Sequence, residues 1–416
     1  MITKPKGTYD LINEDGKYYM AISNTINAFM EAYNYEYIRT PIFEDTQLYH
    51  RSVGEYTDIV SKETYDFKDR GDRLLTLRPE GTAGVVRSFI ENKLYGNRND
   101  AVKLFYNGTM YRYERPQAGR NREFTQFGAE AFGSSDPIID AEIISMGYYL
   151  LKSLGLENIS VAINTLGDKE SRDNYTKALI EYLTPHINEL CEDCQRRLTT
   201  NPLRILDCKV DAENEILKNA PKITDYLSQA SADRFAQVKE LLNLLDVDYE
   251  INDKIVRGLD YYNENVWEYL TEDGITLGGG GRYDDLVENL GGPKTPAIGF
   301  ALGLERIIIE LKKAELTDCL NQQVDAYILC VSNEEKIHAL QIAQDLRLNN
   351  LYVELNNNDL SLKSQFKVAD NLHAKFLIIL KDEELQKGLV TIKDNATKEE
   401  IKIDEYEIID WLLGNI

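Results

Sequence analysis

Residues 103–130 carry the pattern that decides the fold: Lys103-Leu-Phe-Tyr-Asn-Gly-Thr-Met-Tyr-Arg-Tyr-Glu-Arg115, then Pro116-Gln-Ala-Gly-Arg-Asn-Arg122, then Glu123-Phe-Thr-Gln-Phe-Gly-Ala-Glu130. The first and last stretches follow the two-residue side-chain period of β-strands, and a basic, glycine-containing loop joins them. The pattern therefore predicts a hairpin of two strands. Arg112 and Glu114 share one face of the first strand, and Gln126 and Glu130 share one face of the second, so polar groups converge on one side.

Other elements surround this hairpin. A helix is expected over Thr82–Leu94, and a buried strand over Ala297–Leu302 leads into a helix with Arg306 in its first turn. The dipeptide Asp273-Gly274, between two apolar runs, is typical of a type I′ hairpin turn. Because this region lacks the regular strand–helix alternation of a doubly wound fold, we predict an α+β fold with an antiparallel sheet.

The length of the chain indicates more than one domain. A chain of 416 residues is too long for one ordinary hydrophobic core. We predict a first domain over residues 1–320, with a polar, helical insertion over about 168–250. From Asp325 to Ile416 short apolar strands alternate with amphipathic helices, which predicts a separate, compact α/β domain.

Composition narrows the class of protein. No apolar run approaches the roughly 18 residues that span a bilayer, and the first residues lack the pattern of a secretory signal. Five cysteines, an odd number, fit a reducing cytoplasm better than a disulfide framework. The net charge of −23 argues against a nucleic acid partner, yet residues 112–122 contain four arginines and one glutamate. Local charge decides contact, so an RNA partner stays open.

A nucleotide site would have to be built without the usual glycine loops, because the sequence contains neither a P-loop nor G-x-G-x-x-G. Arg112, Arg257 and Arg306 could present guanidinium groups on a sheet face, and these groups suit bidentate phosphate recognition. Gly278–Gly281 is unfavourable in a regular element, so we interpret it as a close backbone approach to a ligand and not as a loose turn. The alternative for Arg112 and Glu114 is an exposed ion pair worth about 0–1 kcal/mol.

A set of sequence blocks runs along nearly the whole chain. These blocks are Lys6-Gly-Thr-Tyr-Asp10, Leu77-Arg-Pro-Glu-Gly-Thr82, Tyr111-Arg-Tyr-Glu-Arg-Pro-Gln117 with Gly119-Arg120, Phe124-Thr-Gln-Phe-Gly-Ala-Glu130, Val256-Arg-Gly-Leu-Asp-Tyr-Tyr262, Gly279-Gly-Gly-Arg-Tyr-Asp284 and Gly299-Phe-Ala-Leu-Gly-Leu-Glu-Arg306. Together they closely resemble the histidyl-tRNA synthetase family. The block that ends in Tyr262 is specific to histidine enzymes, whereas the block that ends in Arg306 is shared by class II synthetases.

The resemblance implies an architecture and a set of partners. The fold would be that of a class II synthetase: an antiparallel-sheet catalytic domain (1–320) with a helical insertion, and a C-terminal α/β anticodon-binding domain (325–416). ATP would be a substrate, accompanied by Mg²⁺, and L-histidine and histidine tRNA would be the other substrates. A cytoplasmic homodimer without membrane association is implied, with Tyr37–Pro41 and the preceding helix at the interface.

The resemblance also implies residue roles in the ATP site. Arg112 would hold the α-phosphate, Glu114 would lie near the adenine, and Arg306 would hold the far phosphates or the base. Arg120 belongs to the same site. Arg257 would assist at the α-phosphorus, where the histidine carboxylate attacks to form histidyl-adenylate, and would also contact the histidine. No protein ligand for a metal is assigned.

The implied histidine-binding residues come from several blocks. Three of them match the family's contacts to the α-amino group: Glu80, Thr82 and Gln126. Glu130 and Tyr262 match the groups that read the two imidazole nitrogens, and Tyr261 and Tyr283 would line the pocket. A site built around such hydrogen bonds can reject an analogue that lacks them by roughly 10⁴–10⁵.

Cys191-x-x-Cys194, Cys208 and the nearby His186 suggest a zinc site. The pattern lacks a second clean pair, so reduced, partly buried cysteines are the favoured interpretation.

Two other functions compete with a ligase. One is the regulatory paralogue that binds the phosphoribosyltransferase of histidine biosynthesis, and the other is a synthetase-like domain that senses uncharged tRNA. The first usually lacks a C-terminal module, which is present here as Asp325–Ile416. The second is expected within a longer chain.

Overall fold

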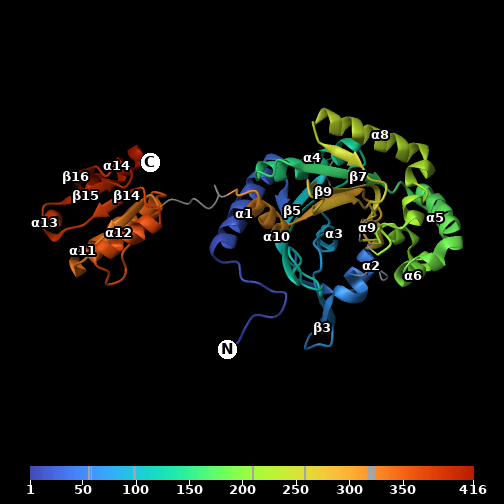
Figure 1. Ribbon diagram of the computed structural model, residues 1–416, viewed down its shortest axis with the longest axis horizontal. Coiled ribbons are helices and arrows are strands. Elements are labelled where there is room, and N and C mark those ends of the chain that lie inside the picture. Colours follow the sequence, from blue (N-terminus) through green and yellow to red (C-terminus); the bar gives the residue numbers. More distant parts are fainter. Residues whose placement is uncertain (55–56, 58, 97–99, 209, 257–258, 317–323) are drawn as a thin grey trace. The chain divides into compact units, whose positions relative to one another are not determined.

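The protein is described from a computed structural model that covers residues 1–54, 57, 59–96, 100–208, 210–256, 259–316 and 324–416. The chain forms two compact units, Met1–Thr317 and Asp318–Ile416 (Figure 1). Both units combine sheets with helices. No helix in these ranges is long and apolar enough to cross a membrane.

An eight-stranded sheet organises the described part of the first unit. Its strands, in spatial order, are β1 (Glu36–Tyr37), β5 (Val102–Tyr111), β6 (Glu123–Phe132), β11 (Ala297–Gly303), β10 (Thr276–Arg282), β9 (Asn263–Thr271), β7 (Ile159–Thr165) and β8 (Tyr249–Ile251). The pairs β1–β5 and β7–β8 are parallel and the others are antiparallel. The predicted antiparallel sheet and its hairpin of strands are therefore confirmed.

One face of this sheet is covered by helices. These are α1 (Asn13–Ala32), α4 (Pro137–Ser153), α8 (Gln229–Leu244) and α10 (Leu304–Lys313). Helix α4 is bound to the sheet by a fully buried ion pair, because Arg282 Nη2 lies 2.6 Å from Asp140 Oδ2 and both side chains are inaccessible. Separating the two side chains would leave a buried charge without a partner, which is energetically costly. The pair therefore holds the end of strand β10, and with it the next residue, Tyr283, against α4.

The opposite face of the sheet carries shorter elements around an open centre. These are α2 (Thr46–Val53), the π-helical turn Ile59–Glu63, α3 (Thr82–Glu91), α9 (Leu286–Asn289) and a small sheet of β2 (Phe43–Asp45), β4 (Leu74–Leu77) and β3 (Tyr65–Lys68). Val85, Val86 and Phe89 of α3 are buried in the same hydrophobic cluster as Tyr106 and Phe132 of the hairpin. This packing brings the start of α3 against the hairpin.

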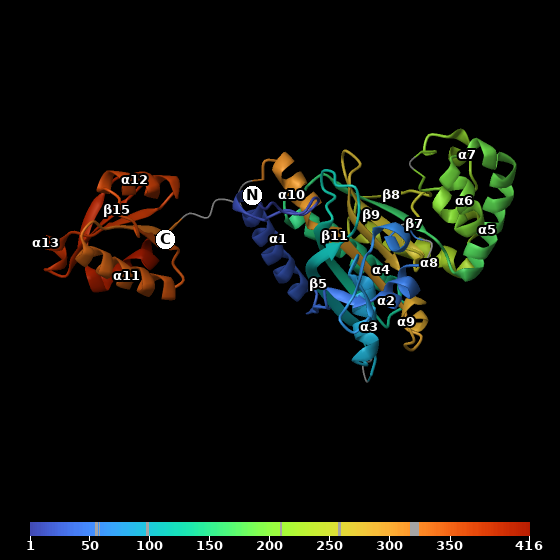
Figure 2. The same ribbon diagram turned by 90° about the horizontal axis from the view of Figure 1, so that it is seen from below.

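A helical segment lies between β7 and β8, where the sequence predicts an insertion. It contains α5 (Lys169–Leu183), α6 (Glu192–Thr200), α7 (Glu215–Lys218), α8 and the 3-10 turns Thr184–Glu189, Pro202–Ile205 and Ile223–Tyr226. Figure 2 shows α5, α6 and α7 grouped beside the large sheet. Helix α8 returns to the sheet and packs on α4.

The second unit has a five-stranded sheet in the order β13 (Val353–Leu355), β12 (Ala326–Leu329), β14 (Phe376–Ile379), β15 (Leu389–Asp394) and β16 (Glu400–Asp404). Its helices are α11 (Asn333–Leu348), α12 (Leu362–Asn371), α13 (Asp382–Leu385) and α14 (Ile408–Asn415). Alternate residues of β12 enter different clusters: Ile328 packs with α11 and α14, whereas Tyr327 packs with α12. Helices therefore cover both faces, as the strand–helix alternation predicts.

Two local expectations differ from the structure. Strand β5 ends at Tyr111 and not at Arg115, although the Arg112 N–H still donates to the Arg122 carbonyl at 2.9 Å. The expected type I′ turn is also wrong. Of its two central residues only Gly274 has a positive φ, +75°, and its N–H donates to Thr271 O, so the turn is a longer one that ends in a left-handed glycine.

Candidate active site

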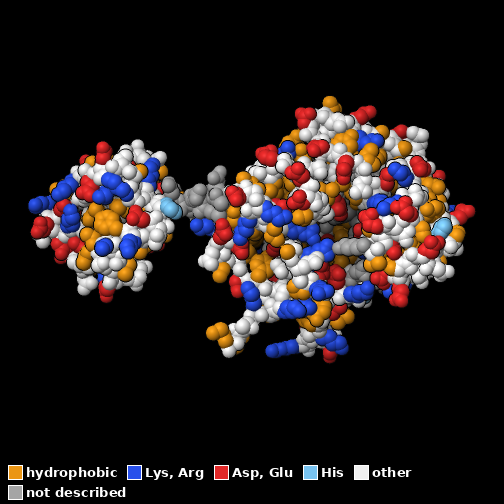
Figure 3. Space-filling view, viewed as in Figure 1, with side chains coloured by type: hydrophobic (Ala, Val, Ile, Leu, Met, Phe, Trp, Pro, Cys, Tyr) orange, Lys and Arg blue, Asp and Glu red, His pale blue; other side chains and the backbone are white. Residues whose placement is uncertain are grey.

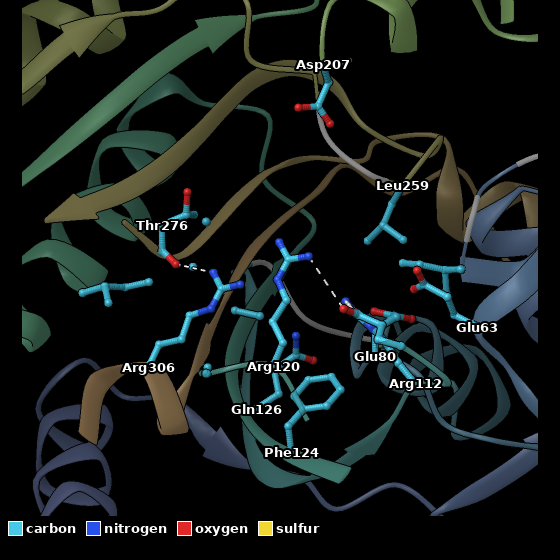
Figure 4. A pocket seen from close by; sticks show the side chains of 18 of the residues that line it. Glu63, Glu80, Arg112, Arg120, Phe124, Gln126, Asp207, Leu259, Thr276 and Arg306 are labelled. Atoms are coloured by element: carbon cyan, nitrogen blue, oxygen red, sulfur yellow. Dashed lines mark hydrogen bonds and ion pairs between the residues drawn. The ribbon is translucent and has the colours of Figure 1, made fainter. Parts of the chain in front are cut away.

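A cavity of about 580 Å³ opens on the sheet face that carries the β5–β6 hairpin (Figure 4). It continues into a second cavity of about 740 Å³. Arg112, Arg120 and Arg306 line both cavities. Figure 3 shows Lys and Arg side chains around a hollow on this face of the first unit. The acidic chain thus gathers arginines in this cleft, as local charge in the sequence suggests, although carboxylates such as Glu63 and Asp207 line it as well.

The start of α3 supplies one wall of the first cavity. Glu80 precedes the helix, and its two carboxylate oxygens accept hydrogen bonds from the backbone N–H groups of Thr82 (2.7 Å) and Ala83 (2.8 Å). These N–H groups have no partner within the helix, so the carboxylate caps its positive end. The two hydrogen bonds hold the carboxyl group of Glu80 in one orientation, at the cavity wall. Burial raises the pKa of Glu80 in spite of these bonds.

Gln126 is oriented by groups behind the cavity. Its Oε1 accepts a hydrogen bond from the Gly81 N–H at 3.2 Å and lies 3.5 Å from the Tyr106 hydroxyl. This arrangement leaves the amide NH₂ group of Gln126 as a donor, and Gln126 lines the cavity.

Glu130 lies behind this wall: 1% of its surface is exposed, and it is not among the described residues that line either cavity. Its Oε1 accepts from Thr82 Oγ1 at 2.7 Å, and its Oε2 accepts a short hydrogen bond from the Tyr283 hydroxyl. Gly299 is the register partner of Glu130 on β11, and a Cβ there would lie 1.7 Å from Glu130 Oε2. Only glycine therefore leaves room for this carboxyl group.

Burial is the main cause of an unusual pKa at this carboxyl group. It raises the pKa of Glu130 from 4.5 to about 8, with a smaller contribution from the negative charge of Glu80, while the hydrogen bonds from Tyr283 and Thr82 oppose the shift. Neutral and ionised forms are therefore both accessible near neutral pH.

The Glu130→Gln variant is expected to show a weaker pH dependence of stability than the parent. In the folded parent Glu130 stays protonated up to a pH of about 8, whereas in the unfolded chain it loses its proton above pH 4.5. The free energy of unfolding of the parent is therefore highest below pH 4.5 and falls as the pH rises to about 8. The fall that Glu130 causes amounts to up to about 5 kcal/mol. Urea unfolding in a Trp411→Phe background follows Trp267, which is buried in the first unit. Parallel pH curves for the two proteins would refute the assignment.

The arginine cluster forms the wall that the two cavities share. Arg112 Nε donates to Pro79 O at 2.8 Å, and its guanidinium group lies 5.1 Å from the centre of the Phe124 ring. Glu114 lies between two cations, 3.8 Å from Arg112 Nη1 and 3.7 Å from Arg120 Nη1. With three arginines lining this region, the cleft suits a polyanion.

Arg306 extends the cluster from the first turn of α10. Its Nη1 donates to the Thr276 carbonyl, as drawn in Figure 4. Burial lowers the pKa of Arg306, and the positive charges of Arg120 and Arg112 lower it further. Repulsion among these side chains would be relieved by a bound anion.

Three tyrosines pack together at the first cavity. Tyr261 and Tyr262 line the cavity. Tyr283, which the sequence predicts in the pocket wall, is not among the described lining residues and lies behind them against Glu130. The Tyr261 ring contacts both others, with ring centres 4.6 Å from Tyr262 and 5.5 Å from Tyr283. The buried Tyr261 hydroxyl has no hydrogen-bond partner among the described residues. Arg257, predicted beside these tyrosines, lies outside the described residues.

The glycine run has a packing role in addition to the approach to a ligand that the sequence predicts. Gly278–Gly281 forms most of strand β10, in the middle of the sheet. A Cβ would lie 2.2 Å from Ala301 O at Gly278 and 2.1 Å from Gly299 O at Gly280. Close contact with the neighbouring strand therefore requires these two glycines, although Gly278 and Gly279 also line the cavity.

Several residues of the site were not predicted from the sequence. Phe124 has the same strand phase as Gln126, so the alternation of β6 could have identified it. Arg197, Arg204 and Asp207 come from the insertion and reach the same cavity. No local pattern could have placed them there, because their position depends on how the insertion packs.

Comparison with known proteins gives consistent matches over the chain. The family described as histidyl-tRNA synthetase matches residues 7–307, and the one described as anticodon binding domain matches residues 325–415. The chain is 48% identical over 409 residues to histidine–tRNA ligase 2 of Bacillus cereus, covering 97% of each, and 46% identical to histidine–tRNA ligase of Anoxybacillus flavithermus, covering 98% of each. It is similar to the crystal structure of apo Staphylococcus aureus histidyl-tRNA synthetase, with a TM-score of 0.84, 39% identity, and coverage of 99% of this chain and 100% of that one.

Proposed function

Since this chain belongs to the histidyl-tRNA synthetase family, we propose that it joins L-histidine to its cognate tRNA at the expense of ATP. It is an aminoacyl-tRNA synthetase, with a class II catalytic fold and a C-terminal anticodon-binding domain. One observation carries the assignment of the site. Buried hydrogen-bonding groups gather in the first cavity, and an arginine cluster lies where that cavity meets the second.

In the first step an oxygen of the histidine carboxylate forms a bond to the α-phosphorus of ATP. The bond from that phosphorus to the bridging oxygen breaks, and pyrophosphate leaves with the electron pair. Arg112 would hold the α-phosphate, and Arg120 and Arg306 the leaving phosphates, because all three arginines line the wall that the two cavities share. Glu114 would offset the repulsion between Arg112 and Arg120 and lie near the adenine. Arg257 would assist at the phosphorus, as the family motif implies.

Magnesium would enter as part of the Mg²⁺–ATP substrate. Such an ion keeps most of its coordination with phosphates and water, and it needs only one or two carboxylates from the protein. Glu63, Glu114 and Asp207 line the cleft together with the arginines, so the donor types fit this ion.

Histidine would occupy the end of the first cavity near α3. Glu80 and Gln126 would bind the α-amino group, with Thr82 fixing the wall between them and Glu130. Glu130 and Tyr262 would read the two imidazole nitrogens, and Tyr261 would contact the ring. Tyr283 acts as a positioning residue, because its hydroxyl donates to Glu130 and orients that carboxyl group.

In the second step a hydroxyl of the terminal adenosine of the tRNA attacks the histidyl carbonyl. An ester bond forms, AMP leaves with the electrons of the broken acyl–phosphate bond, and the proton of the attacking hydroxyl is released to solvent. The catalytic domain would comprise residues 1–320 with its insertion at about 168–250, and residues 325–416 would contact the anticodon.

The active form would be a homodimer in the cytoplasm. Tyr37 is exposed within the segment where the sequence places the interface, and Ile42, Phe43, Phe67 and Leu74 are exposed on or beside the small sheet that follows it. The Phe43 and Phe67 rings pack edge to face at 6.1 Å, which joins two of these apolar side chains. Exposed apolar patches on soluble proteins mark interaction surfaces.

Histidine-dependent exchange of pyrophosphate into ATP tests the first step, and charging of purified histidine tRNA tests the second. Exchange that requires histidine supports the ligase. A folded protein that binds ATP but shows no exchange would instead support the regulatory paralogue, whose partner is a phosphoribosyltransferase. The matches to ligases over the full chain do not favour that alternative.

A further inference from the structure

The insertion brings three cysteines and an aspartate together, far along the chain from the catalytic motifs. One ligand atom from each of Cys191, Cys194, Cys208 and Asp211 lies within 4.8 Å of all the others. Cys191 Sγ is 3.6 Å from Cys208 Sγ, and Cys208 Sγ is 3.6 Å from Asp211 Oδ2. The sequence lacked a second clean pair for a metal, and folding supplies one from Cys208 and Asp211. His186 instead lies 3.0 Å from Glu189.

Local structure explains how the four groups converge. Cys191 is the N-cap residue of α6, and Cys194 lies one turn later, so both side chains point from the same end of the helix. Cys208 and Asp211 follow the 3-10 turn Pro202–Ile205, which folds back on α6. Asp211 Oδ2 also accepts a hydrogen bond from the Cys191 N–H at 3.0 Å, which binds the two halves of the cluster to each other.

The spacing and the chemistry of the cluster match one metal. A tetrahedral Zn²⁺ with bonds of about 2.3 Å to sulfur and about 2.0–2.2 Å to oxygen requires ligand atoms roughly 3.5–3.8 Å apart. The two distances of 3.6 Å lie in that range, and all four ligand atoms lie within 4.8 Å of one another, so a small inward movement would complete the tetrahedron. Three thiolates and one carboxylate select zinc over Mg²⁺ or Ca²⁺, which prefer oxygen. Cys194, Cys208 and Asp211 are at most 8% exposed, so four protein ligands would close the site.

We propose that Cys191, Cys194, Cys208 and Asp211 bind one Zn²⁺ that stabilises the insertion and thereby fixes one wall of the active-site cavity. The elements here are short: α7 and the turn Pro202–Ile205 have four residues each. Small modules of this kind often need a metal or a disulfide in addition to their hydrophobic core.

The wall of the cavity depends on the same elements. Asp193, Arg197 and Arg204 line the cavity and lie on or between the segments that the four ligands join. Arg197 Nη1 donates to Arg204 O at 3.3 Å. Asn201 Nδ2 donates to Asp260 Oδ1 at 2.9 Å, which connects the end of α6 to the block that contains Tyr261. Release of the metal would therefore loosen both the insertion and its contact with the site.

The test measures metal in the full-length chain, produced with zinc in the medium and purified without a histidine tag. Elemental analysis should find one zinc per chain. The Cys191→Ser/Cys208→Ser double variant should lose it, whereas Cys330→Ser, a buried cysteine of the second unit, should keep it. Dialysis against a chelator in reducing buffer, followed by Co²⁺, should produce the visible bands of tetrahedral cobalt and the near-ultraviolet bands of thiolate–cobalt bonds.

Each outcome decides the proposal. Zinc that the double variant loses, together with a cobalt–thiolate spectrum in the parent, supports it. Thermal unfolding of the zinc-free parent should also shift to higher temperature when Zn²⁺ is added. A parent that is folded but takes up neither Zn²⁺ nor Co²⁺, or zinc that persists in the double variant, overturns it. Because metal content and cobalt spectra do not depend on catalysis, failure here leaves the proposed ligase activity unaffected.

Discussion

Replacing Arg112 by alanine is expected to slow histidine-dependent ATP–pyrophosphate exchange by about 10²–10³, which is the usual cost of losing one preorganised charge contact at a reacting group. Arg112 lines the wall that both cavities share, and it is held there by its hydrogen bond to Pro79 O and by the Phe124 ring. The guanidinium group is thus in place before substrate arrives. Negative charge that develops on the α-phosphate would meet a donor that needs no reorganisation.

Two further variants give this experiment its controls. Arg115→Ala removes an exposed arginine from the same loop, outside the described cavity lining, and should leave exchange within a few-fold of the parent. Arg112→Lys keeps the charge without the fork-shaped donor pair, so an intermediate loss is expected. Circular dichroism should show that all three proteins remain folded. Equal rates for the Arg112→Ala and Arg115→Ala variants would remove Arg112 from the proposed mechanism.

The Glu130→Gln variant is expected to lose about 10² in kcat/KM for histidine, mostly through KM, although the same change weakens the pH-dependent loss of stability. An imidazole N–H bound to a carboxylate gains roughly 1.5–3 kcal/mol, and the neutral amide of glutamine accepts a weaker hydrogen bond. A pH dependence of stability that weakens together with substrate binding is the signature of a buried ionisable group kept for function.

Tyr283→Phe is the matched comparison for that measurement. It removes the hydroxyl that donates to Glu130 but keeps both the ring and the carboxyl group. A positioning role predicts a smaller loss, with the pH profile of kcat/KM displaced toward higher pH, because this hydrogen bond lowers the pKa of Glu130. If Glu130→Gln leaves KM for histidine unchanged, the assignment of Glu130 to the imidazole is wrong.

The elements of the fold could largely be read from the sequence. The two-residue period of β5 and β6 located the central hairpin, and α10 was expected directly after the buried strand Ala297–Leu302. These features are local, because strand and helix periods depend on residues a few positions apart. The turn at Asp273-Gly274 was assigned to the wrong type, since its backbone angles depend on the strands it joins as well as on its own dipeptide.

By itself the sequence determined the family, the antiparallel sheet and the set of residues that bear the chemistry, because motifs and periodicities are written along the chain. Only the tertiary structure decided which distant residues meet. Tyr283 donates to Glu130 across 153 positions, and Gly299 provides the space for that carboxyl group. Cys191 meets Cys208 and Asp211, and Arg197 reaches the cavity from the insertion. The physical reason is the same in each case: close packing of separate elements sets these distances, and packing leaves no mark at a single position in the sequence.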